Sequence, residues 1–275
     1  MLLRFSKYEG LGNDFLLFET EALGGARLAV EQAIALCDRH RGIGADGLLL
    51  LDLNGPSMEV VNSDGSVPEM CGNGLRCAAL HLARRIGEAT LEVTVATAAG
   101  PHPCVVVNRP GAESVAVQMA PPSMVPSDLP LSSPTPWLDH PLDVDGRTLH
   151  FSAVSMGNPH AVTFDEVGEA RAALGPAVQS DPHFPEGVNV GFVSERDGSS
   201  MRLDVLERGA GWTQACGTGA CAAAVAAVET GRAERDEQLS IHLPGGTLLI
   251  TVEAPGDSVL MQGPARFVFS GEIEI

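Results

Sequence analysis

Lysine is nearly absent from this chain, whose 275 residues contain sixteen arginines but a single lysine, Lys7. Enzymes that use pyridoxal phosphate hold the cofactor as a Schiff base on a lysine side chain. Lys7 lies in the first strand-like segment, and no phosphate-binding sequence accompanies it. For chemistry at an amino-acid α-carbon we therefore expect no cofactor of this kind, and we predict no metal.

Positive charge and long apolar runs are also scarce. The formal net charge is −18 at pH 7, which disfavours binding to nucleic acids and to anionic membranes. No stretch approaches the length of a transmembrane helix, and the N-terminal sequence turns polar too early for a secretory signal. The six cysteines form no CxxC pair, and no N-x-S/T site is present. These features favour free thiols in a reducing cytoplasm.

The length allows one large domain or two medium domains with buried cores. Residues 121–136 contain six prolines, a composition typical of a linker or an ordered surface loop. We place the main boundary near 118–122.

Periodicity predicts many short strands and few helices. The predicted helices cover 26–39, 75–86, 166–174 and 220–229. The predicted strands cover 2–8, 15–19, 48–51, 59–62, 91–96, 104–108, 114–119, 148–155, 161–164, 188–193, 201–206, 239–243, 246–253, 258–262 and 266–270. Each half thus contains several strands and one helix preceded by the sequence CGxG, which indicates a weak internal duplication.

One glycine motif has the wrong surroundings for a nucleotide site. Gly42, Gly44 and Gly47 match the spacing G-x-G-x-x-G of dinucleotide-binding proteins. That motif requires a strand before it and a helix after it, whereas here the predicted order is reversed. A glycine-rich turn into a buried strand is the better interpretation.

Two short sequences share the pattern Cys-Gly-x-Gly, at residues 71–74 and 216–219. Each precedes a predicted helix, whose free N–H groups and macrodipole favour a thiolate. Free cysteine titrates near pH 8.5, and a helix N-terminus that lowers this pKa by about 1.5 units would make about half of it thiolate at neutral pH.

Two such thiols at one site would titrate as a coupled pair, with one thiolate and one thiol favoured. A two-base racemase needs this arrangement, because one sulfur removes the α-proton and the other returns a proton to the opposite face. We therefore predict Cys71 and Cys216 as the catalytic pair. The alternative is that both are core residues, and the repeated motif argues against it. The remaining cysteines are predicted to be structural: Cys37, Cys77, Cys104 and Cys221.

The glycines beside each cysteine suit the binding of a carboxylate. Backbone N–H groups at the two helix N-termini could hold it and stabilise the charge that develops as the α-proton leaves. The alternative is that the glycines only permit tight turns. The predicted donors are Gly72, Asn73, Gly217 and Thr218.

Further polar residues lie in turn-like contexts. For the asparagines, local hydrogen bonding competes with substrate binding as an explanation. Glu207 and Arg208 could bind an ammonium and a carboxylate group, or be solvated surface charges. His160 could tune a thiol or satisfy a strand end. The asparagines are Asn13, Asn62, Asn158 and Asn189.

These motifs together resemble those of the diaminopimelate epimerase family. In chain order they are GLGNDF (10–15), RHRGIGADG (39–47), NSDGS (62–66), CGNGLRC (71–77), GNPH (157–160), GVNVGF (187–192) and ERGAGWTQACGTGA (207–220). The resemblance therefore covers nearly the whole chain.

The resemblance implies an isomerase that interconverts LL- and meso-diaminopimelate without a cofactor, in lysine and peptidoglycan precursor biosynthesis. By position, Cys71 and Cys216 match the catalytic acid and base, and His160 has a supporting role. The residues that match the substrate site are Asn13, Asn62, Gly72, Asn73, Asn158, Asn189, Glu207, Arg208, Gly217 and Thr218.

The family fold implies the α+β class, with two pseudo-symmetric domains that are each a β-barrel-like antiparallel sheet around a central helix. The N-terminal domain would comprise 1–118 and about 263–275, and the C-terminal domain 119–262, with the active site in the cleft between them. The resemblance also implies a homodimer. Two positions depart from the family: Gly47 replaces a glutamine that reaches the site in some members, and Trp212 replaces a frequent acidic residue.

Two other functions remain open. One is another isomerase of the same superfamily, such as a proline or hydroxyproline racemase or a phenazine-biosynthesis isomerase. Those enzymes lack the full set of asparagines with Glu-Arg that a second zwitterionic substrate end requires. The other is a non-catalytic amino-acid-binding or thiol redox-sensing protein, in which the two cysteines would form a regulatory disulfide.

Overall fold

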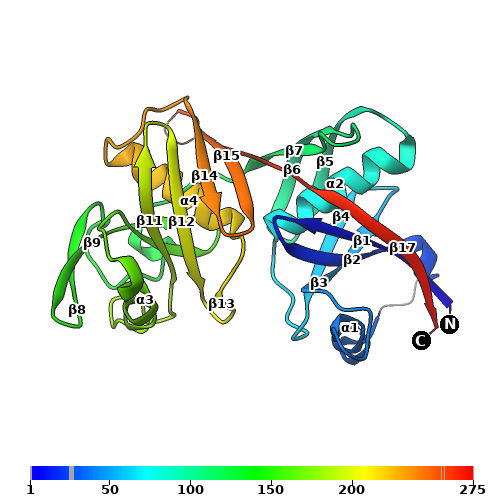
Figure 1. Cartoon of the computed structure of the whole chain (residues 1–275), viewed down its shortest axis with the longest axis horizontal. Helices are drawn as coiled ribbons and strands as arrows, with labels where there is room; N and C mark the ends of the chain where they lie inside the picture. The colour runs from blue at the N-terminus through cyan, green and yellow to red at the C-terminus, as the bar shows by residue number, and fades with distance from the viewer. Residues whose placement is uncertain (1, 25–27, 255, 257, 275) are drawn as a thin grey trace. The chain divides into compact units, whose positions relative to one another are not determined.

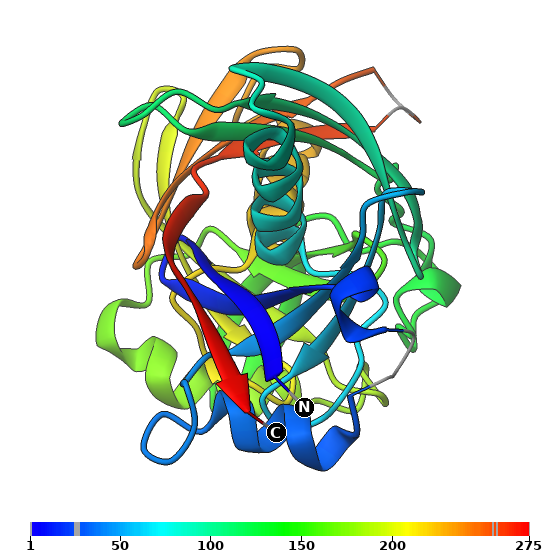
Figure 2. The same ribbon diagram turned by 90° about the vertical axis from the view of Figure 1, so that its right-hand side faces the viewer.

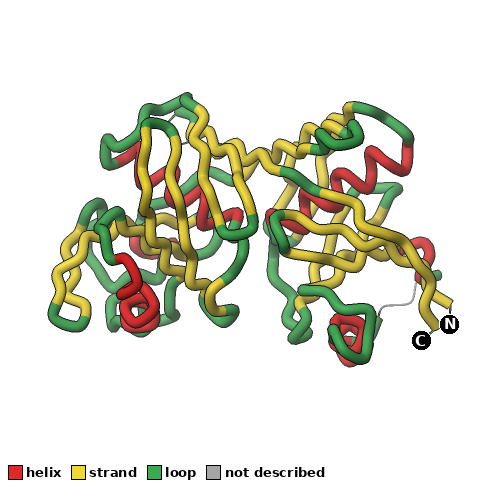
Figure 3. The backbone as a smooth tube through the Cα atoms, viewed as in Figure 1, coloured by secondary structure: helices red, strands yellow, loops and turns green. Residues whose placement is uncertain are grey.

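The computed structural model describes residues 2–24, 28–254, 256 and 258–274 (Figure 1). The chain divides into two compact units, which we call the N-terminal unit (Met1–Val117 and Gln262–Ile275) and the C-terminal unit (Gln118–Met261). Strands outnumber helices in each unit (Figure 3), and the predicted α+β class is confirmed. Within the described part of the chain, no helix is long and apolar enough to cross a membrane.

The elements follow one another in a simple order along each unit. The first unit begins with β1 (Leu2–Gly10), β2 (Asn13–Glu19), the 3₁₀ turn η1 (Thr20–Leu23), α1 (Val30–Cys37), β3 (Gly47–Asp52), β4 (Ser57–Asn62), α2 (Gly72–Ile86), β5 (Thr90–Thr97), β6 (Gly100–Val107) and β7 (Ser114–Met119). The chain continues with η2 (Pro126–Asp128), β8 (His140–Val144), β9 (Arg147–Ser155), β10 (Pro159–Thr163), η3 (Gly168–Ala170), α3 (Arg171–Gln179), β11 (Asn189–Asp197), β12 (Ser200–Glu207), β13 (Gly211–Trp212), α4 (Gly217–Glu229), β14 (Gln238–Leu243), β15 (Gly246–Val252), β16 (Val259–Gly263) and β17 (Arg266–Glu274).

The two units repeat one topology, which confirms the predicted internal duplication. In the N-terminal unit β2 is parallel to β3 across α1, and β4 is parallel to β5 across α2. In the C-terminal unit β10 is parallel to β11 across α3, and β12 is parallel to β14 across α4. Parallel neighbours require a crossover connection, and the helices provide it. The sheets are therefore mixed, with these parallel pairs beside the antiparallel pairing that the family resemblance implied.

A long buried helix runs through the middle of each unit, as expected. All residues from Gly72 to Ala83 of α2 are buried, and α2 contacts β1 to β6 and β17 around it (Figure 2). In α4 the buried residues are mostly alanines, and the helix contacts β9 to β12, β14 and β15. Small side chains let strands approach such a helix from several sides. The N-terminus of each central helix is thereby fixed by its unit's sheet.

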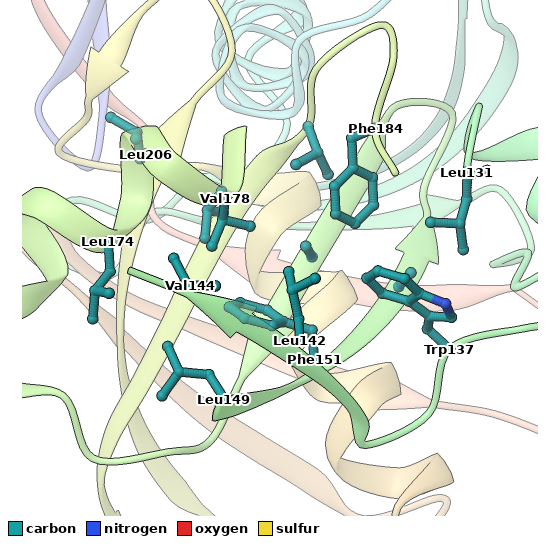
Figure 4. Packing of buried hydrophobic residues seen from close by; sticks show 14 of the residues in the cluster. Leu131, Trp137, Leu142, Val144, Leu149, Phe151, Leu174, Val178, Phe184 and Leu206 are labelled. Carbon is teal, nitrogen blue, oxygen red and sulfur yellow. The ribbon is translucent and has the colours of Figure 1, made fainter. Parts of the chain in front are cut away.

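The opposite face of each sheet packs against a smaller helix. In the N-terminal unit, Leu16 and Phe18 of β2 join a cluster with Leu36 of α1. In the C-terminal unit, Figure 4 shows the corresponding cluster, in which Leu174 and Val178 of α3 lie among side chains of the sheet and the loop before it. The central strands are buried on both faces, which explains their continuous apolar runs.

The central helices begin earlier than predicted. Helix α2 starts at Gly72 and α4 at Gly217, three residues before the predicted positions 75 and 220. Glycine has low helix propensity, so the sequence pattern places these residues outside the helix. A cap immediately before them offsets that cost, since an N-cap group satisfies a free N–H of the first turn.

The two smaller helices also differ from prediction. Helix α1 is shorter than the predicted 26–39, and residues 26–27 lie outside the described residues. It ends at Cys37, because the Asp38 carboxylate then accepts the N–H groups of His40 and Arg41. Helix α3 covers Arg171–Gln179 instead of 166–174. It contains Pro176, and the helix is held in place by the packing of its apolar face in the core. Strands β8 and β13 were not predicted.

Candidate functional site

The two predicted catalytic cysteines have the same local structure. Cys71 is the N-cap of α2, and its Sγ accepts the N–H of Gly74 at 3.4 Å. Cys216 is the N-cap of α4, and its Sγ accepts the N–H of Gly219 at 3.4 Å. Each sulfur thus occupies the place of the hydroxyl or carboxylate oxygen that usually caps a helix. Cys71 is partly exposed and Cys216 is buried.

The residues after each cysteine form the first turn of a helix. Gly72 and Asn73 begin α2, and Gly217 and Thr218 begin α4. N–H groups at the first positions of a helix have no intrahelical acceptor and point toward the positive end of the macrodipole. The predicted carboxylate donors therefore lie at the two helix N-termini.

The glycine at the third helical position has a steric role at both sites. A Cβ at Gly74 would lie 2.8 Å from Cδ2 of Leu49, and one at Gly219 would lie 3.1 Å from Sγ of Cys216. A side chain at either position would push against the sheet or against the sulfur itself. The second glycine of each CGxG sequence therefore allows the cysteine to cap the helix.

Asn13 and Asn73, two of the predicted substrate-binding residues, are in contact in the N-terminal unit. The Nδ2 of Asn73 donates to the Oδ1 of Asn13 at 3.1 Å, and the Nδ2 of Asn13 donates to the Oδ2 of Asp46 at 2.8 Å. Asn73 is buried in the first turn of α2. The structure thus ties the start of β2 to the helix that Cys71 caps.

Asn62 forms a local hydrogen bond instead. Its Nδ2 donates to the Oγ of Ser66 at 2.9 Å, and its backbone N–H donates to the carbonyl of Ser66. This is the turn-type bonding that competed with substrate binding in the sequence. The next residue, Ser63, donates its N–H to the carbonyl of Asp46, so the turn still lies beside the Asn13 network.

The glycine at position 47, which departs from the family pattern, is explained by the closeness of the neighbouring backbone. It opens β3 opposite Asn62 of β4, and a Cβ built on it would lie 2.8 Å from the carbonyl oxygen of Val61. A glutamine could not occupy this position without a backbone shift. The interpretation of the glycine motif as a turn into a buried strand is confirmed.

His160 lies at the centre of a buried polar cluster in the C-terminal unit. Its Nε2 lies 3.1 Å from the Oδ1 of Asn158 and 3.1 Å from the Oγ1 of Thr218. Burial and the positive charge of Arg208 lower the pKa of His160 to about 3, so the imidazole is neutral at physiological pH. Because the Asn158 oxygen can only accept, Nε2 carries the proton.

The proton on His160 orients the Thr218 hydroxyl. The single Nε2–H is shared between the oxygens of Asn158 and Thr218, so the Oγ1 of Thr218 accepts it and the hydroxyl hydrogen is directed to the Sγ of Cys216, 3.6 Å away. This hydrogen bond and the N–H of Gly219 both lower the pKa of Cys216. His160 is thus connected to Cys216 through one hydroxyl group.

The expected lowering of the Cys216 pKa is nevertheless wrong. Burial, and after it the negative charge of Glu207, raise the pKa of Cys216 well above its usual value. The helix N-terminus and the Thr218 hydroxyl oppose this rise but do not outweigh it. Burial in a low-dielectric interior disfavours the charged form of a thiol. Cys216 is therefore a neutral thiol at neutral pH.

The remaining predicted residues of this unit connect its strands. Asn189 donates from Nδ2 to the carbonyl of Pro159 and accepts the backbone N–H of Arg208 on Oδ1. Arg208 donates from Nη1 to the carbonyl of Glu186. Glu207 accepts the hydroxyl of Thr213 at 2.6 Å. Asn189 therefore holds the Glu207–Arg208 turn against β10, beside the cysteine helix.

Trp212, the second departure from the family pattern, contributes to packing. Its ring lies 6.0 Å from that of Phe192, and a Cβ at Gly175 of α3 would lie 3.3 Å from it. It also lines a pocket of about 380 Å³ with Arg171 and Asp204. None of the predicted site residues lines that pocket.

The single lysine is part of an ion-pair network. The Nζ of Lys7 lies 2.8 Å from Oδ2 of Asp14 and donates to the carbonyl of Gly44 at 2.6 Å.

Within residues 2–24, 28–254, 256 and 258–274, no three His, Cys, Asp or Glu side chains are grouped so that they could hold a metal ion.

Sequence reasoning missed several residues that hold the predicted ones. Asp46 lies within a quoted motif but had no assigned role, and it bonds Asn13. Arg76 is fully buried in α2 and bonds Asn73, and an arginine on an otherwise apolar helix is the signal that could have identified it. Thr213 bonds Glu207, and nothing in its sequence context indicates this contact.

Sequence comparisons identify close relatives of this chain. The sequence model of the family described as diaminopimelate epimerase matches residues 5–125 and 152–268. A protein named diaminopimelate epimerase from Pseudomonas syringae pv. tomato is 43% identical over 282 residues, which cover 100% of both chains. One of the same name from Synechococcus elongatus is 43% identical over 284 residues, which cover 100% of this chain and 99% of the relative.

Solved structures with the same fold are more distant in sequence. A phenazine biosynthesis protein of the PhzF family from Bacillus anthracis superposes with a TM-score of 0.71 at 16% identity, over 100% of both chains. A probable proline racemase from Agrobacterium radiobacter K84 superposes with a TM-score of 0.69 at 17% identity, over 99% of this chain and 93% of that one. At this identity the likeness concerns the fold alone.

Proposed function

The chain belongs to the diaminopimelate epimerase family, and we infer that it interconverts LL- and meso-diaminopimelate without a cofactor. This reaction supplies precursors for lysine and peptidoglycan biosynthesis. The observation that supports its catalytic residues best is the duplicated cap, in which a cysteine sulfur accepts the third N–H of a central helix in each unit. Both thiols thus have the same structural relation to a helix N-terminus.

In the proposed mechanism Cys71 and Cys216 are the acid and the base. A thiolate takes the α-proton and becomes a thiol, and the resulting carbanion takes a proton from the other thiol, which becomes a thiolate. Burial favours the neutral form of Cys216, which supports Cys216 as the proton donor and Cys71 as the base in the resting protein. The reverse direction uses the two sulfurs in exchanged roles.

The helix N-termini are proposed to bind the carboxylate at the reacting carbon. The N–H groups of Gly72, Asn73, Gly217 and Thr218 provide donors that also stabilise the negative charge of the carbanion. The distal end of the substrate is assigned to the polar side chains of both units, with His160 in support through Thr218. Those side chains are Asn13, Asn62, Asn158, Asn189, Glu207 and Arg208.

The function is tested by incubating the reduced protein with LL-diaminopimelate in heavy water. We expect meso-diaminopimelate with one deuterium at the inverted carbon, measured by chiral chromatography and mass spectrometry. Absence of both product and deuterium with folded, reduced protein would contradict the function. Deuterium exchange on proline instead would favour a proline racemase, whose fold this chain shares.

The wider organisation is also proposed. We propose two domains, 1–118 with about 263–275 and 119–262, which the division into two compact units supports. The mechanism requires both sulfurs to reach one α-carbon. Exposed Val268 and Phe269 on β17, at 48% and 43%, support a homodimer in which a second copy covers them. Sedimentation of the wild type and of Val268→Glu measures the oligomeric state of each.

The free cysteines support a location in a reducing cytoplasm.

A further inference from the structure

A fully buried guanidinium lies under the first turn of the α2 helix. Arg76 donates from Nη2 to the Oδ1 of Asn73 at 2.8 Å, from Nη1 to the carbonyl of Gly72 at 3.4 Å, and from Nε to the carbonyl of Pro264 at 3.2 Å. A buried charge of this kind is tolerated only when its hydrogen bonds are made. Arg76 therefore holds both residues that follow Cys71 from the inside of the unit.

The hydrogen bonds from Arg76 continue in one direction through two amides. Asn73 accepts from Arg76 on Oδ1 and donates from Nδ2 to Asn13. Asn13 accepts on Oδ1 and donates from Nδ2 to the carboxylate of Asp46. We call this chain of hydrogen bonds, from Arg76 through Asn73 and Asn13 to Asp46, the amide relay.

The two ends of the amide relay determine its direction. A guanidinium can only donate and a carboxylate can only accept, whereas an amide side chain turned by 180° exchanges its donor and acceptor atoms. If either asparagine turned over, two donors or two acceptors would face each other at both of its contacts. Arg76 and Asp46 therefore permit one orientation of each amide.

The acceptor end is itself held in place. Oδ1 of Asp46 is 2.8 Å from Nη2 of Arg39, and Oδ2 also accepts the backbone N–H of Asp14 at 3.1 Å. Arg39 also binds the carboxylate of Asp14, and Lys7 pairs with that Asp14 carboxylate. These contacts fix the carboxylate of Asp46 relative to β2 before any ligand binds.

We propose that Arg76 and Asp46 are positioning residues that set the amide orientation of Asn13 for substrate binding. The proposal rests on the proposed function insofar as it takes Asn13 as a substrate-binding residue. An amide with one Nδ2 hydrogen and one Oδ1 lone pair engaged keeps one donor and one acceptor for a ligand. In the fixed orientation these lie on defined sides, so Asn13 distinguishes an ammonium from a carboxylate group.

The test compares Arg76→Met with Arg85→Met, a matched change on the exposed end of the same helix. Selective ¹⁵N labelling of asparagine gives carboxamide signals for the seven asparagines, and Asn13→Ala identifies the signal of Asn13. In Arg76→Met the turned relay has one mismatched contact, at Asp46, instead of two, so we expect this signal to broaden as the turned orientation becomes a minor exchanging state. We also expect the KM for LL-diaminopimelate to rise about five- to tenfold, with kcat/KM falling mainly through KM.

A merely structural role for Arg76 would lower thermal stability and leave these readouts unchanged. A single unperturbed Asn13 signal, together with a KM within twofold of Arg85→Met, would overturn the proposal. Asp46→Ala provides the second variant, because its side chain is 42% exposed and its loss leaves the helix intact. It should give the same two effects, and the double variant, in which neither end fixes the direction of the relay, should exceed the product of the single effects.

The two proposals fail in different ways. If Asn13→Ala keeps the wild-type KM while Arg76→Met still broadens the Asn13 carboxamide signal, the relay stands as an orienting device but Asn13 does not bind the substrate. That outcome contradicts the positioning role stated above. If Asn13→Ala raises KM but both relay variants leave the signal sharp, substrate binding stands and the relay does not orient it.

Discussion

At the residue scale, the protonation of Cys216 depends on competition between burial and local hydrogen bonds. Burial and the charge of Glu207 raise its pKa, while the Thr218 hydroxyl and the N–H of Gly219 lower it. Proton return to a carbanion requires a protonated group, so a raised pKa suits a sulfur that donates first. In the proposed mechanism the sulfur of Cys71 then supplies the thiolate.

This competition predicts the effect of removing the Glu207 charge. In a Cys71→Ser background, Glu207→Gln should lower the pKa of Cys216 and shift its alkylation by iodoacetamide to lower pH. The reason is that a nearby negative charge disfavours the thiolate. The rate is measured for the peptide containing Cys216 by mass spectrometry across pH 7 to about 10.

Alkylation profiles that coincide with and without Glu207 would contradict this account of the Cys216 pKa. Asp204→Asn is the control, because Asp204 lies on the same strand, where it pairs with Arg171. It should leave the Cys216 profile unchanged.

At the scale of single elements, the start of β2 is held by charges that titrate in acid. Burial alone would raise the pKa of Asp14, but hydrogen bonds from Arg39 and Lys7 outweigh it and lower the pKa below its usual value of 3.8. A carboxyl group with a lowered pKa in the folded state stabilises the fold above its unfolded pKa. That contribution disappears as the pH falls through the folded value.

Asp14→Asn should therefore lower the free energy of unfolding at neutral pH by about 2 kcal/mol, the scale of a lost charged hydrogen bond. It should also flatten the decrease in stability below about pH 4, where the wild-type carboxylate becomes protonated. Urea unfolding at several pH values measures both effects. An equally steep acid decrease in Asp14→Asn and in the control Asp52→Asn would exclude Asp14 as its source.

Sequence periodicity predicted most strands but misplaced the helix starts. The apolar runs of β3 and β9 are long enough to identify strands directly. The first turns of α2 and α4 contain glycines, and only tertiary structure shows that a cysteine caps them. Strand β13 has two residues, too short for any periodic signal.

The contacts that complete the candidate site were not predictable from sequence. Asn13 and Asn73 are recognisable by motif, yet their hydrogen bond joins residues 60 positions apart. The pKa of Cys216 is raised by burial. The sequence shows only that Cys216 precedes a helix, which by itself predicts a lowered pKa. Motif positions thus identified candidate residues, whereas their orientation and protonation required the fold.

At the scale of the whole molecule, duplication explains why two equivalent cysteines exist. Each unit repeats the order of parallel crossovers, and the second crossover places a cysteine-capped helix inside the sheet. An ancestral single unit would provide one thiol at one helix N-terminus. In the proposed mechanism the two units provide the acid and the base that inversion at a carbon requires.

The most direct test of the two-thiol mechanism measures α-deuterium incorporation and epimer formation in heavy water by the wild type, Cys71→Ser and Cys216→Ser. Cys104→Ser, which changes a buried cysteine on β6, is the control. The mechanism predicts that each of the first two variants loses about 10²- to 10⁴-fold in epimer formation from either LL- or meso-diaminopimelate, while the control keeps its activity. Epimer formation at the wild-type rate by either Cys71→Ser or Cys216→Ser would contradict it.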